Sequence, residues 1–144
     1  MTIKYLCLSV ALIICVLTPC SAEEVPISDA TSECLECHAI IHPGIVSDWQ
    51  KSRHARITPK QAMAVEGLAR KVSSQAVAEP LSGVVVGCAE CHLLRPDAHA
   101  DSYEHNGYTV HNVVSPDDCA TCHPTEAEQY SRNIMSHAHG NLVN

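Results

Sequence analysis

The chain has 144 residues, among them nine cysteines, ten histidines, one tryptophan and no phenylalanine. Aromatic residues make up only 3% of the chain, which excludes a core built mainly from large apolar side chains. The formal net charge of −7 argues against nucleic acid as a partner.

The first 22 residues have the order of a secretory signal peptide. Lys4 supplies the positive start, residues 6–17 form a short apolar run, and small residues precede a cleavage site before Glu23. The run is shorter than the ~20 apolar residues that span a bilayer, so we expect cleavage and no stable membrane span. A retained anchor is one alternative, and a lipid-modified Cys20 is another that Pro19 fits poorly. We therefore predict a signal peptide over 1–22 and an exported domain over 23–144, periplasmic or otherwise extracytoplasmic.

Three pentapeptides, CLECH, CAECH and CATCH, each consist of a Cys-x-x-Cys pair followed at once by histidine. They use all six cysteines that remain after residue 22. This is the attachment signature of c-type haem, in which two thiols bond to one porphyrin and the histidine binds the iron as proximal ligand. The motifs predict three covalently attached haem c groups, bonded to Cys34, Cys37, Cys88, Cys91, Cys119 and Cys122 and ligated by His38, His92 and His123.

Three disulfides, a zinc ribbon and a thioredoxin-like pair are the alternative uses of such cysteines. Disulfides need no histidine after every second cysteine, and a zinc ribbon uses two pairs where this chain has three. A thioredoxin-like pair needs a βαβ setting that the sequence lacks. Three porphyrins would also provide the large buried apolar surface that so few aromatic residues cannot provide. We therefore expect that the chain does not fold stably without haem.

Helices and loops are the elements predicted between the motifs. A helix is expected to begin at Ser47 and to lead to His54. Thr58 and Gln61 have the spacing of a capping box, and apolar residues recur at helical spacing after them. The sequence therefore predicts an amphipathic scaffold helix within residues 57–80, with a structural role.

The segments after the second motif are predicted to be less regular. Residues 95–107 are rich in polar and turn-forming types, which predicts a loop. Residues 109–114 are extended, and alternation aims His111 inward. A further helix is expected to begin at Pro124 and to stop near Gly140.

Histidine is the expected second ligand of each iron. Two methionines remain after residue 22, too few for three irons, whereas seven histidines lie outside the motifs. Bis-histidine ligation also gives a lower reduction potential than histidine with methionine. These histidines are His42, His54, His99, His105, His111, His137 and His139.

His54 and His137 have matching surroundings. Each follows a motif by about one helix, and each is preceded by a neighbouring glutamine and aromatic residue and then by serine. We interpret this as an internal half-repeat of haem attachment, helix and outgoing histidine. Both are predicted to be distal ligands, each to a haem other than the one just before it. The alternative is that each is an exposed histidine at a helix end that binds no iron.

The third distal ligand is less determined by the sequence. His111 is preferred because of its extended segment, and His105 is next. His42 and His99 lie in turn and loop sequences, although His42 is near enough to reach a neighbouring haem. His139 competes with His137. The predicted metal ligands are thus His38, His54, His92, His111, His123 and His137.

Two stretches carry a resemblance to a known family. CLECHAIIHPGIVSDWQKSRHA and VSPDDCATCHPTEAEQYSRNIMSHAHGNL resemble the N-terminal part of hydroxylamine oxidoreductase-like octahaem cytochromes c, from about Cys34 to Leu142. The resemblance implies a mostly helical fold with closely packed, mainly bis-histidine haems that pass electrons. That family carries eight haems, and its catalytic haem lies beyond the third attachment site. The resemblance therefore assigns no catalytic residue here and indicates a fragment of a larger octahaem protein.

The sequence thus predicts a mainly α fold with long loops, a multihaem cytochrome c fold organised around three covalently bound haems. The expected function is electron transfer by an exported cytochrome. A truncated hydroxylamine oxidoreductase, or a related enzyme that converts nitrite or hydroxylamine, is the alternative. A third is an assembly module that docks onto a haem-rich partner chain or onto its own copy. The acidic charge suits basic redox partner proteins.

Overall fold

The computed structural model describes residues 24–137, and this part of the chain is rich in short helices joined by long loops, as predicted. The predicted signal peptide, His139 and Gly140 lie outside the described residues. Among residues 24–137, no helix has both the length and the apolar character needed to cross a membrane.

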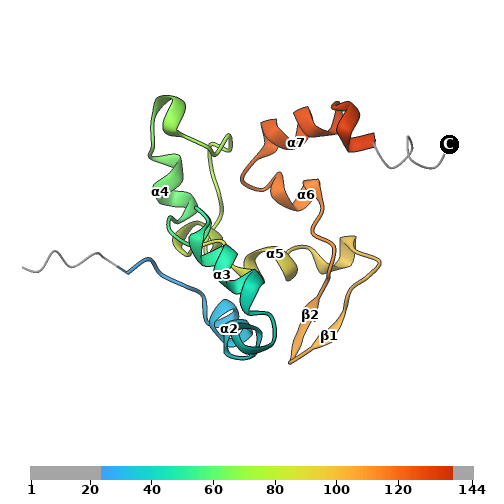
Figure 1. The fold of residues 1–144 in the computed structure, drawn as a ribbon. Helices are drawn as coiled ribbons and strands as arrows, with labels where there is room; N and C mark the ends of the chain where they lie inside the picture. The colour runs from blue at the N-terminus through green and yellow to red at the C-terminus, as the bar shows by residue number, and fades with distance from the viewer. Residues whose placement is uncertain (1–23, 138–144) are drawn as a thin grey trace, which may run out of the picture.

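The elements follow one another with the third motif at the far end from the first (Figure 1). The α-helices are α2 (Asp29–Ile41), α3 (Pro43–Lys51), α4 (Pro59–Met63), α5 (Cys88–His92), α6 (Pro116–Cys119) and α7 (Pro124–Ser131). Single turns of 3₁₀-helix are η1 (Gly67–Ala69), η2 (Leu81–Gly83), η3 (Pro96–Ala98) and η4 (Ile134–His137). A two-stranded antiparallel sheet consists of β1 (Tyr103–His105) and β2 (Tyr108–Val110).

The first two helices meet at a sharp corner. Ser28 caps α2 by accepting a hydrogen bond from the Thr31 backbone N–H at 3.1 Å. The α2 helix ends before Pro43, which occupies the first position of α3, where its missing N–H costs nothing. The predicted helix start at Ser47 is therefore wrong by four residues, because the proline starts the helix earlier.

The region after Thr58 departs most from the prediction. Its capping box is confirmed, since the Thr58 hydroxyl accepts from the Gln61 N–H and the Gln61 side chain accepts from the Thr58 N–H. The helix that follows, however, ends at Met63, so the predicted scaffold helix within 57–80 is wrong. Gly67 has a φ of +61° and Leu68 is 95% exposed, so the apolar repeat there does not form a buried helical face.

The hairpin was missed by the prediction of a loop over 95–107. Tyr103 pairs with Val110 and His105 with Tyr108, and Asn106 and Gly107 connect the strands. Both connecting residues have positive φ, as a two-residue hairpin turn of the Asn-Gly type requires. The hairpin holds His105 opposite α2 and brings the chain back to His111.

Small side chains form the apolar core of the described part. The buried apolar residues are Val46, Ala62, Val72, Val85 and Ala89, and five polar residues are equally buried: Thr31, Thr58, Ser82, His111 and Asp118. Tertiary packing therefore depends on buried hydrogen bonds as much as on apolar contact. Such groups must be paired, because an unpaired buried polar group costs about 1–3 kcal/mol.

One buried polar junction joins α2 to α5. The Thr31 hydroxyl donates to Glu90 Oε2 at 2.7 Å and accepts from the Ala89 N–H at 3.1 Å. The same Glu90 oxygen accepts from the Gly87 N–H at 2.9 Å. A Cβ on Gly87 would lie 2.5 Å from Thr31 Cγ2, so the close approach of the two helices requires glycine. This junction fixes the first Cys-x-x-Cys-His motif against the second.

We predict that Gly87→Ala lowers the free energy of unfolding by about 1–3 kcal/mol, because Thr31 is buried and β-branched and cannot move away without losing its hydrogen bonds. Gly44→Ala is the control, since a Cβ there meets nothing within 4 Å, and it is expected to be neutral or slightly stabilising. Denaturant unfolding of both variants measures the difference. Equal stability of the two would contradict the junction described here.

Candidate functional site

Each Cys-x-x-Cys-His motif lies on or next to a helix. The first is inside α2, the second is the whole of α5, and the third runs from the end of α6 to His123, the residue before α7. In a helix, residues at steps of three and four share one face. Cys34, Cys37 and His38 therefore project from the same side of α2, which matches the attachment of one planar group.

The second motif lies between the other two, as its thiols show. Burial raises the pKa of the Cys34 thiol, and the neighbouring Cys88 raises it further. Burial raises the pKa of Cys91 to about 11, with Cys119 the next cause. All six cysteines of the described part are free thiols, so the alternative of three disulfides does not occur in this structure. Motifs that are 31 to 54 residues apart in the sequence thus form one continuous row.

Each motif histidine has a neighbour at Nδ1. His92 Nδ1 lies 2.7 Å from the carbonyl oxygen of His111, His38 Nδ1 lies 3.2 Å from His42 Nδ1, and His123 Nδ1 lies 3.9 Å from a Glu126 carboxylate oxygen. Among residues 24–137, Nε2 of these three histidines has no hydrogen-bond partner. A partner at one ring nitrogen orients the ring and leaves the other available to a metal.

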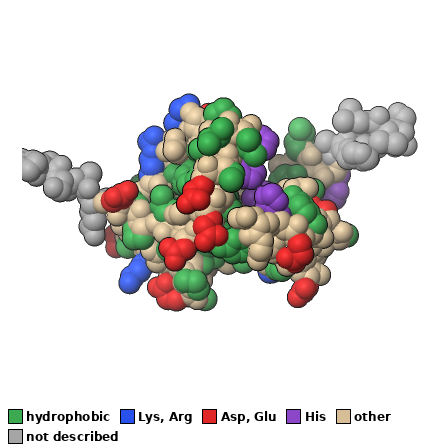
Figure 2. All heavy atoms as spheres, turned by 90° about the horizontal axis from the view of Figure 1, so that it is seen from below, with side chains coloured by type: hydrophobic (Ala, Val, Ile, Leu, Met, Phe, Trp, Pro, Cys, Tyr) green, Lys and Arg blue, Asp and Glu red, His purple; other side chains and the backbone are tan. Residues whose placement is uncertain are grey.

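A largely apolar cavity of about 480 Å³ joins the first two motifs. Its walls come from α2, α3, α5 and the hairpin, and they include Cys34, His38, Trp49, Cys88, His92 and His105. The Trp49 indole is fixed by a 2.9 Å hydrogen bond from Nε1 to the Val86 carbonyl. Figure 2 shows histidine side chains gathered in a hollow of the surface. The size and apolar lining suit a cofactor-sized group.

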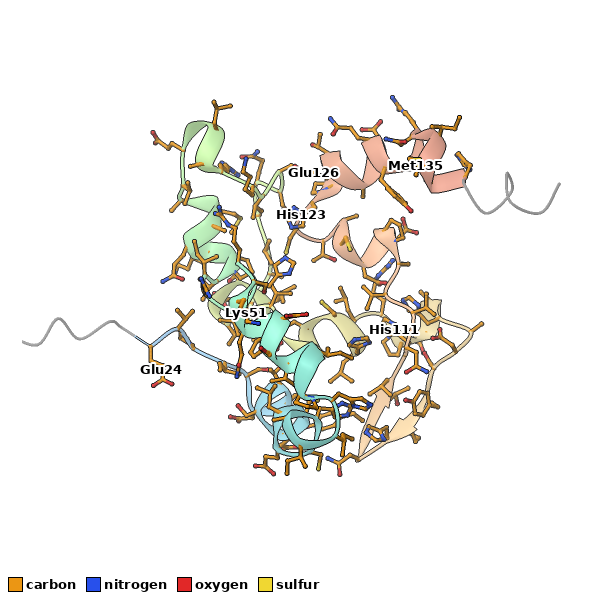
Figure 3. The ribbon with its side chains drawn as sticks, in the orientation of Figure 1. Glu24, Lys51, His111, His123, Glu126 and Met135 are labelled. Carbon is orange, nitrogen blue, oxygen red and sulfur yellow. The ribbon has the colours of Figure 1, made fainter. Side chains whose placement is uncertain are left out.

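A second, smaller cavity of about 120 Å³ lies beside the third motif. It is lined by His54, Cys122 and His123, by apolar residues that include Ala62 and Val72, and by the cations Arg53 and Lys71. His123 lies between the segment that carries α4 and the helix α7 (Figure 3). Apolar side chains and two cations therefore line this cavity, and the cations can pair with carboxylates.

Residues 70–76 close this second cavity, although the sequence indicated nothing of their role. The Ser74 N–H donates to the Cys122 carbonyl at 3.1 Å, and the Ser73 hydroxyl bonds to Glu126 on α7. Arg70 shapes the segment by donating to the carbonyls of Val72 and Ser74. A stretch predicted as plain scaffold therefore forms a wall of the site.

Two pairs of histidine rings have the spacing expected across one metal ion. An imidazole nitrogen binds a transition metal at about 2 Å, so two such rings on opposite sides have centroids about 6 Å apart. The centroids of His54 and His123 are 6.2 Å apart and those of His38 and His105 are 6.1 Å apart. Partial burial lowers the pKa of His54, and the nearby His123 lowers it further, which favours the neutral, metal-binding form.

His111 has a different environment from these rings. It is 1% exposed, its Nδ1 lies 3.1 Å from the Val113 carbonyl oxygen, and its Nε2 lies 3.0 Å from that of Leu94. Its ring stacks on His99 at 3.6 Å. Although its centroid is 6.0 Å from that of His92, the contact between them is the bond from His92 Nδ1 to the His111 backbone. Both ring nitrogens of His111 thus face backbone carbonyl oxygens, and the neutral ring can donate to one of the two.

His137 is exposed, with Nε2 3.2 Å from the Ser131 carbonyl oxygen of its own segment. Within the described range it makes no ring contact with a motif histidine. The predicted half-repeat thus brings His54 to a motif and leaves His137 apart from all three. Its role as a ligand stays a prediction.

A buried carboxylate, Asp118, lies directly before the third motif. Its side chain is 1% exposed, and it accepts hydrogen bonds from Ser115 N–H at 2.7 Å and from Ser115 Oγ at 2.8 Å. Arg95 Nη2 lies at 2.6 Å and His99 Nε2 at 3.1 Å. Burial alone would raise the pKa of Asp118, but these donors outweigh it and hold that pKa well below its usual range.

The chain is similar to a solved structure described as a hypothetical multiheme protein. The two share 46% sequence identity and superpose with a TM-score of 0.72 over 76% of this chain and 21% of the other. The chain therefore spans about a fifth of the length of that protein. No protein-family model matches the sequence.

We predict that Asp118→Asn lowers the stability by about 1–3 kcal/mol at neutral pH, because it removes the buried anion that Arg95 and His99 contact, although Arg95 is 43% exposed and stays partly hydrated. The depressed pKa of Asp118 stabilises the fold above its unfolded pKa of about 3.9, and this contribution is lost as pH falls below about 5. The variant should therefore lose less stability than wild type between about pH 5 and pH 2. Asp117→Asn, at an exposed neighbour, should keep the wild-type slope. Denaturant unfolding across this pH range measures the free energy of unfolding of each variant. The same pH dependence in both variants would contradict the stabilising role of the Asp118 charge.

Proposed function

We propose that this chain is an electron-transfer part of a c-type multihaem cytochrome and holds three covalently bound haems. The observation that carries this proposal is the packing of the three motifs into one row, with Cys34 beside Cys88 and Cys91 beside Cys119. The similarity to a described multiheme protein supports it. Haems attached to such a row of motifs would be held close to one another by the chain, as electron transfer between them requires.

The donor set fits haem c. The six free thiols are the groups that form thioether bonds to porphyrin vinyl groups, and His38, His92 and His123 each have an available Nε2 for iron. When bound, haem supplies one-electron chemistry. The protein orients His92 and His38 through hydrogen bonds at Nδ1 and lines the first cavity with apolar side chains. At the third site it presents Arg53 and Lys71 as partners for carboxylates.

We assign distal ligands from the ring pairs. His54 serves the third motif, opposite His123, and His105 serves the first, opposite His38. This keeps the sequence prediction for His54 and prefers His105 over His111. For the second motif, His42 lines the same cavity as His92 and is the candidate among the described histidines. His111 contributes its backbone carbonyl, which orients His92.

We also propose that the chain is exported and loses residues 1–22 before haem attachment, on the basis of its N-terminal sequence. N-terminal sequencing of protein secreted with its own leader tests this. A mature chain that starts at Glu23 supports export. A chain that retains its first residues contradicts it.

We predict three haems per chain when the protein is produced in cells that mature cytochromes c. The paired variant Cys88→Ala/Cys91→Ala should hold two haems, as should the equivalent pair in either other motif, because each thiol pair attaches one porphyrin. Intact mass and the pyridine haemochrome spectrum count them. A wild-type chain that carries no covalent haem after such production would overturn the proposed function.

The ligand assignments predict distinct spectra. His54→Ala and His105→Ala should each convert one of three low-spin haems to a high-spin form that binds CO after reduction. His111→Gln should leave all irons low-spin, because both His111 nitrogens face carbonyls. EPR and visible spectra measure the change. High-spin iron in His111→Gln, together with unchanged spectra in His105→Ala, would restore His111 as the ligand.

Wild-type spectra also separate electron transfer from the enzyme alternative. Catalysis at a haem iron requires an open coordination position. Fully low-spin wild-type protein that binds no CO when reduced would support the electron-transfer role. A wild-type haem that binds CO would favour a substrate-converting site in this chain.

A further inference from the structure

The buried Asp118 lies where the second and third motifs meet. It precedes Cys119 directly, and its charge contributes to the raised pKa of Cys91, the second thiol of α5. Its partners Arg95 and His99 belong to the segment that leaves the second motif. The carboxylate is therefore bonded on one side to the third motif's own cap at Ser115 and on the other to the chain that follows His92.

Arg95 is held in an uncommon conformation by this contact. Its φ and ψ are both 52°, in the left-handed region that residues other than glycine seldom adopt. Such a conformation persists where the surroundings determine it. Here Nε and Nη2 both donate to the same Asp118 oxygen, at 3.2 and 2.6 Å. The ion pair thus fixes the turn by which the chain leaves the second motif.

The charges of the network are unequally exposed. The Asp118 side chain is 1% exposed, whereas that of Arg95 is 43% exposed. Water screens the guanidinium more than the carboxylate, so the field inside the protein is dominated by the anion. A negative charge in a low-dielectric interior favours the oxidised, more positive state of a nearby iron.

His99, His111 and Asp118 also present ligand atoms close enough for a metal ion. Two observations argue for an ion pair instead. Arg95 already occupies a carboxylate oxygen at 2.6 Å, and its positive charge opposes a cation there. Both nitrogens of His111 point at backbone carbonyl oxygens 3.0 and 3.1 Å away, so a metal ion bound to either would have to enter between the ring and its backbone neighbour.

We propose that Asp118 is a positioning residue that fixes the third motif against the second. We also propose that its negative charge lowers the reduction potentials of the haems attached to these two motifs. The inference rests on the proposed function, since it needs haems at these motifs. It goes further, because it assigns a role in electron transfer to a residue that binds neither porphyrin nor iron. The positive charge of Arg95 opposes the electrostatic effect of Asp118 on these potentials. Its hydrogen bonds to Asp118, however, help to hold the two motifs together.

Spectroelectrochemical titration of the three-haem protein tests this. Asp118→Asn should raise at least one of the three potentials, and the effect should be absent in Asp117→Asn, which removes the same charge from the exposed neighbour. Arg95→Gln removes the opposing cation and should shift potentials downward. Opposite shifts from the two network variants would not arise from simple loosening, which should move both in one direction.

Several outcomes would overturn the inference. These are equal shifts in Asp118→Asn and Asp117→Asn, shifts of the same sign in Asp118→Asn and Arg95→Gln, or one equivalent of zinc in the wild type that Asp118→Asn loses. If Asp118→Asn does not fold, a downward shift in Arg95→Gln supports the inference and an upward or absent one refutes it. Failure of the proposed function is separate, because it appears as missing covalent haem in the wild type.

Discussion

Two carboxylates, the partly buried Glu90 and the buried Asp118, hold the three attachment motifs in a row, and the rest of the site depends on them. Glu90 and Asp118 each occupy the third position of a short helix and accept hydrogen bonds from its N-terminal end. Each also bonds outside its helix, Glu90 to Thr31 of α2 and Asp118 to Arg95. The same carboxylate therefore stabilises the start of its own helix and also binds a distant segment of the chain. Helix formation and tertiary packing thus depend on one side chain.

This arrangement compensates for a thin apolar core. The buried apolar side chains are small, while larger ones such as Ile45 are 72% exposed, and Ile45 lines the cavity between the first two motifs. A porphyrin bound there would cover apolar surface that no side chain of the described part covers, and so contribute to folding. The buried hydrogen bonds then set where the motifs lie, and the cofactor supplies apolar burial. That division explains why a chain with so few aromatic residues places polar groups in its interior.

The three motifs, the N-terminal cap of α4 and the importance of His54 could be inferred from short-range spacing, because thiol, imidazole and capping chemistry act over a few residues. The structure places the His54 ring close to that of His123. The helix within 57–80 could not, since its apolar repeat at Val65, Leu68 and Val72 matches a helix that tertiary contacts override. There the chain instead bonds to the third motif through Ser74. The Asn-Gly turn was a readable hairpin signal, whereas Arg53 and Lys71 become site residues only through folding.

The half-repeat shows the limit of local similarity. His54 and His137 follow similar sequences and are both exposed, yet the ring centroid of His54 lies 6.2 Å from that of His123, while His137 makes no ring contact with a motif histidine among the described residues. The difference lies in the segments of the chain that face each histidine. Opposite His54, residues 70–76 bind the third motif and form a cavity, and the described residues offer nothing equivalent to His137. A histidine at the end of such a helix therefore approaches an attachment motif only where a distant segment of the chain brings that motif to it.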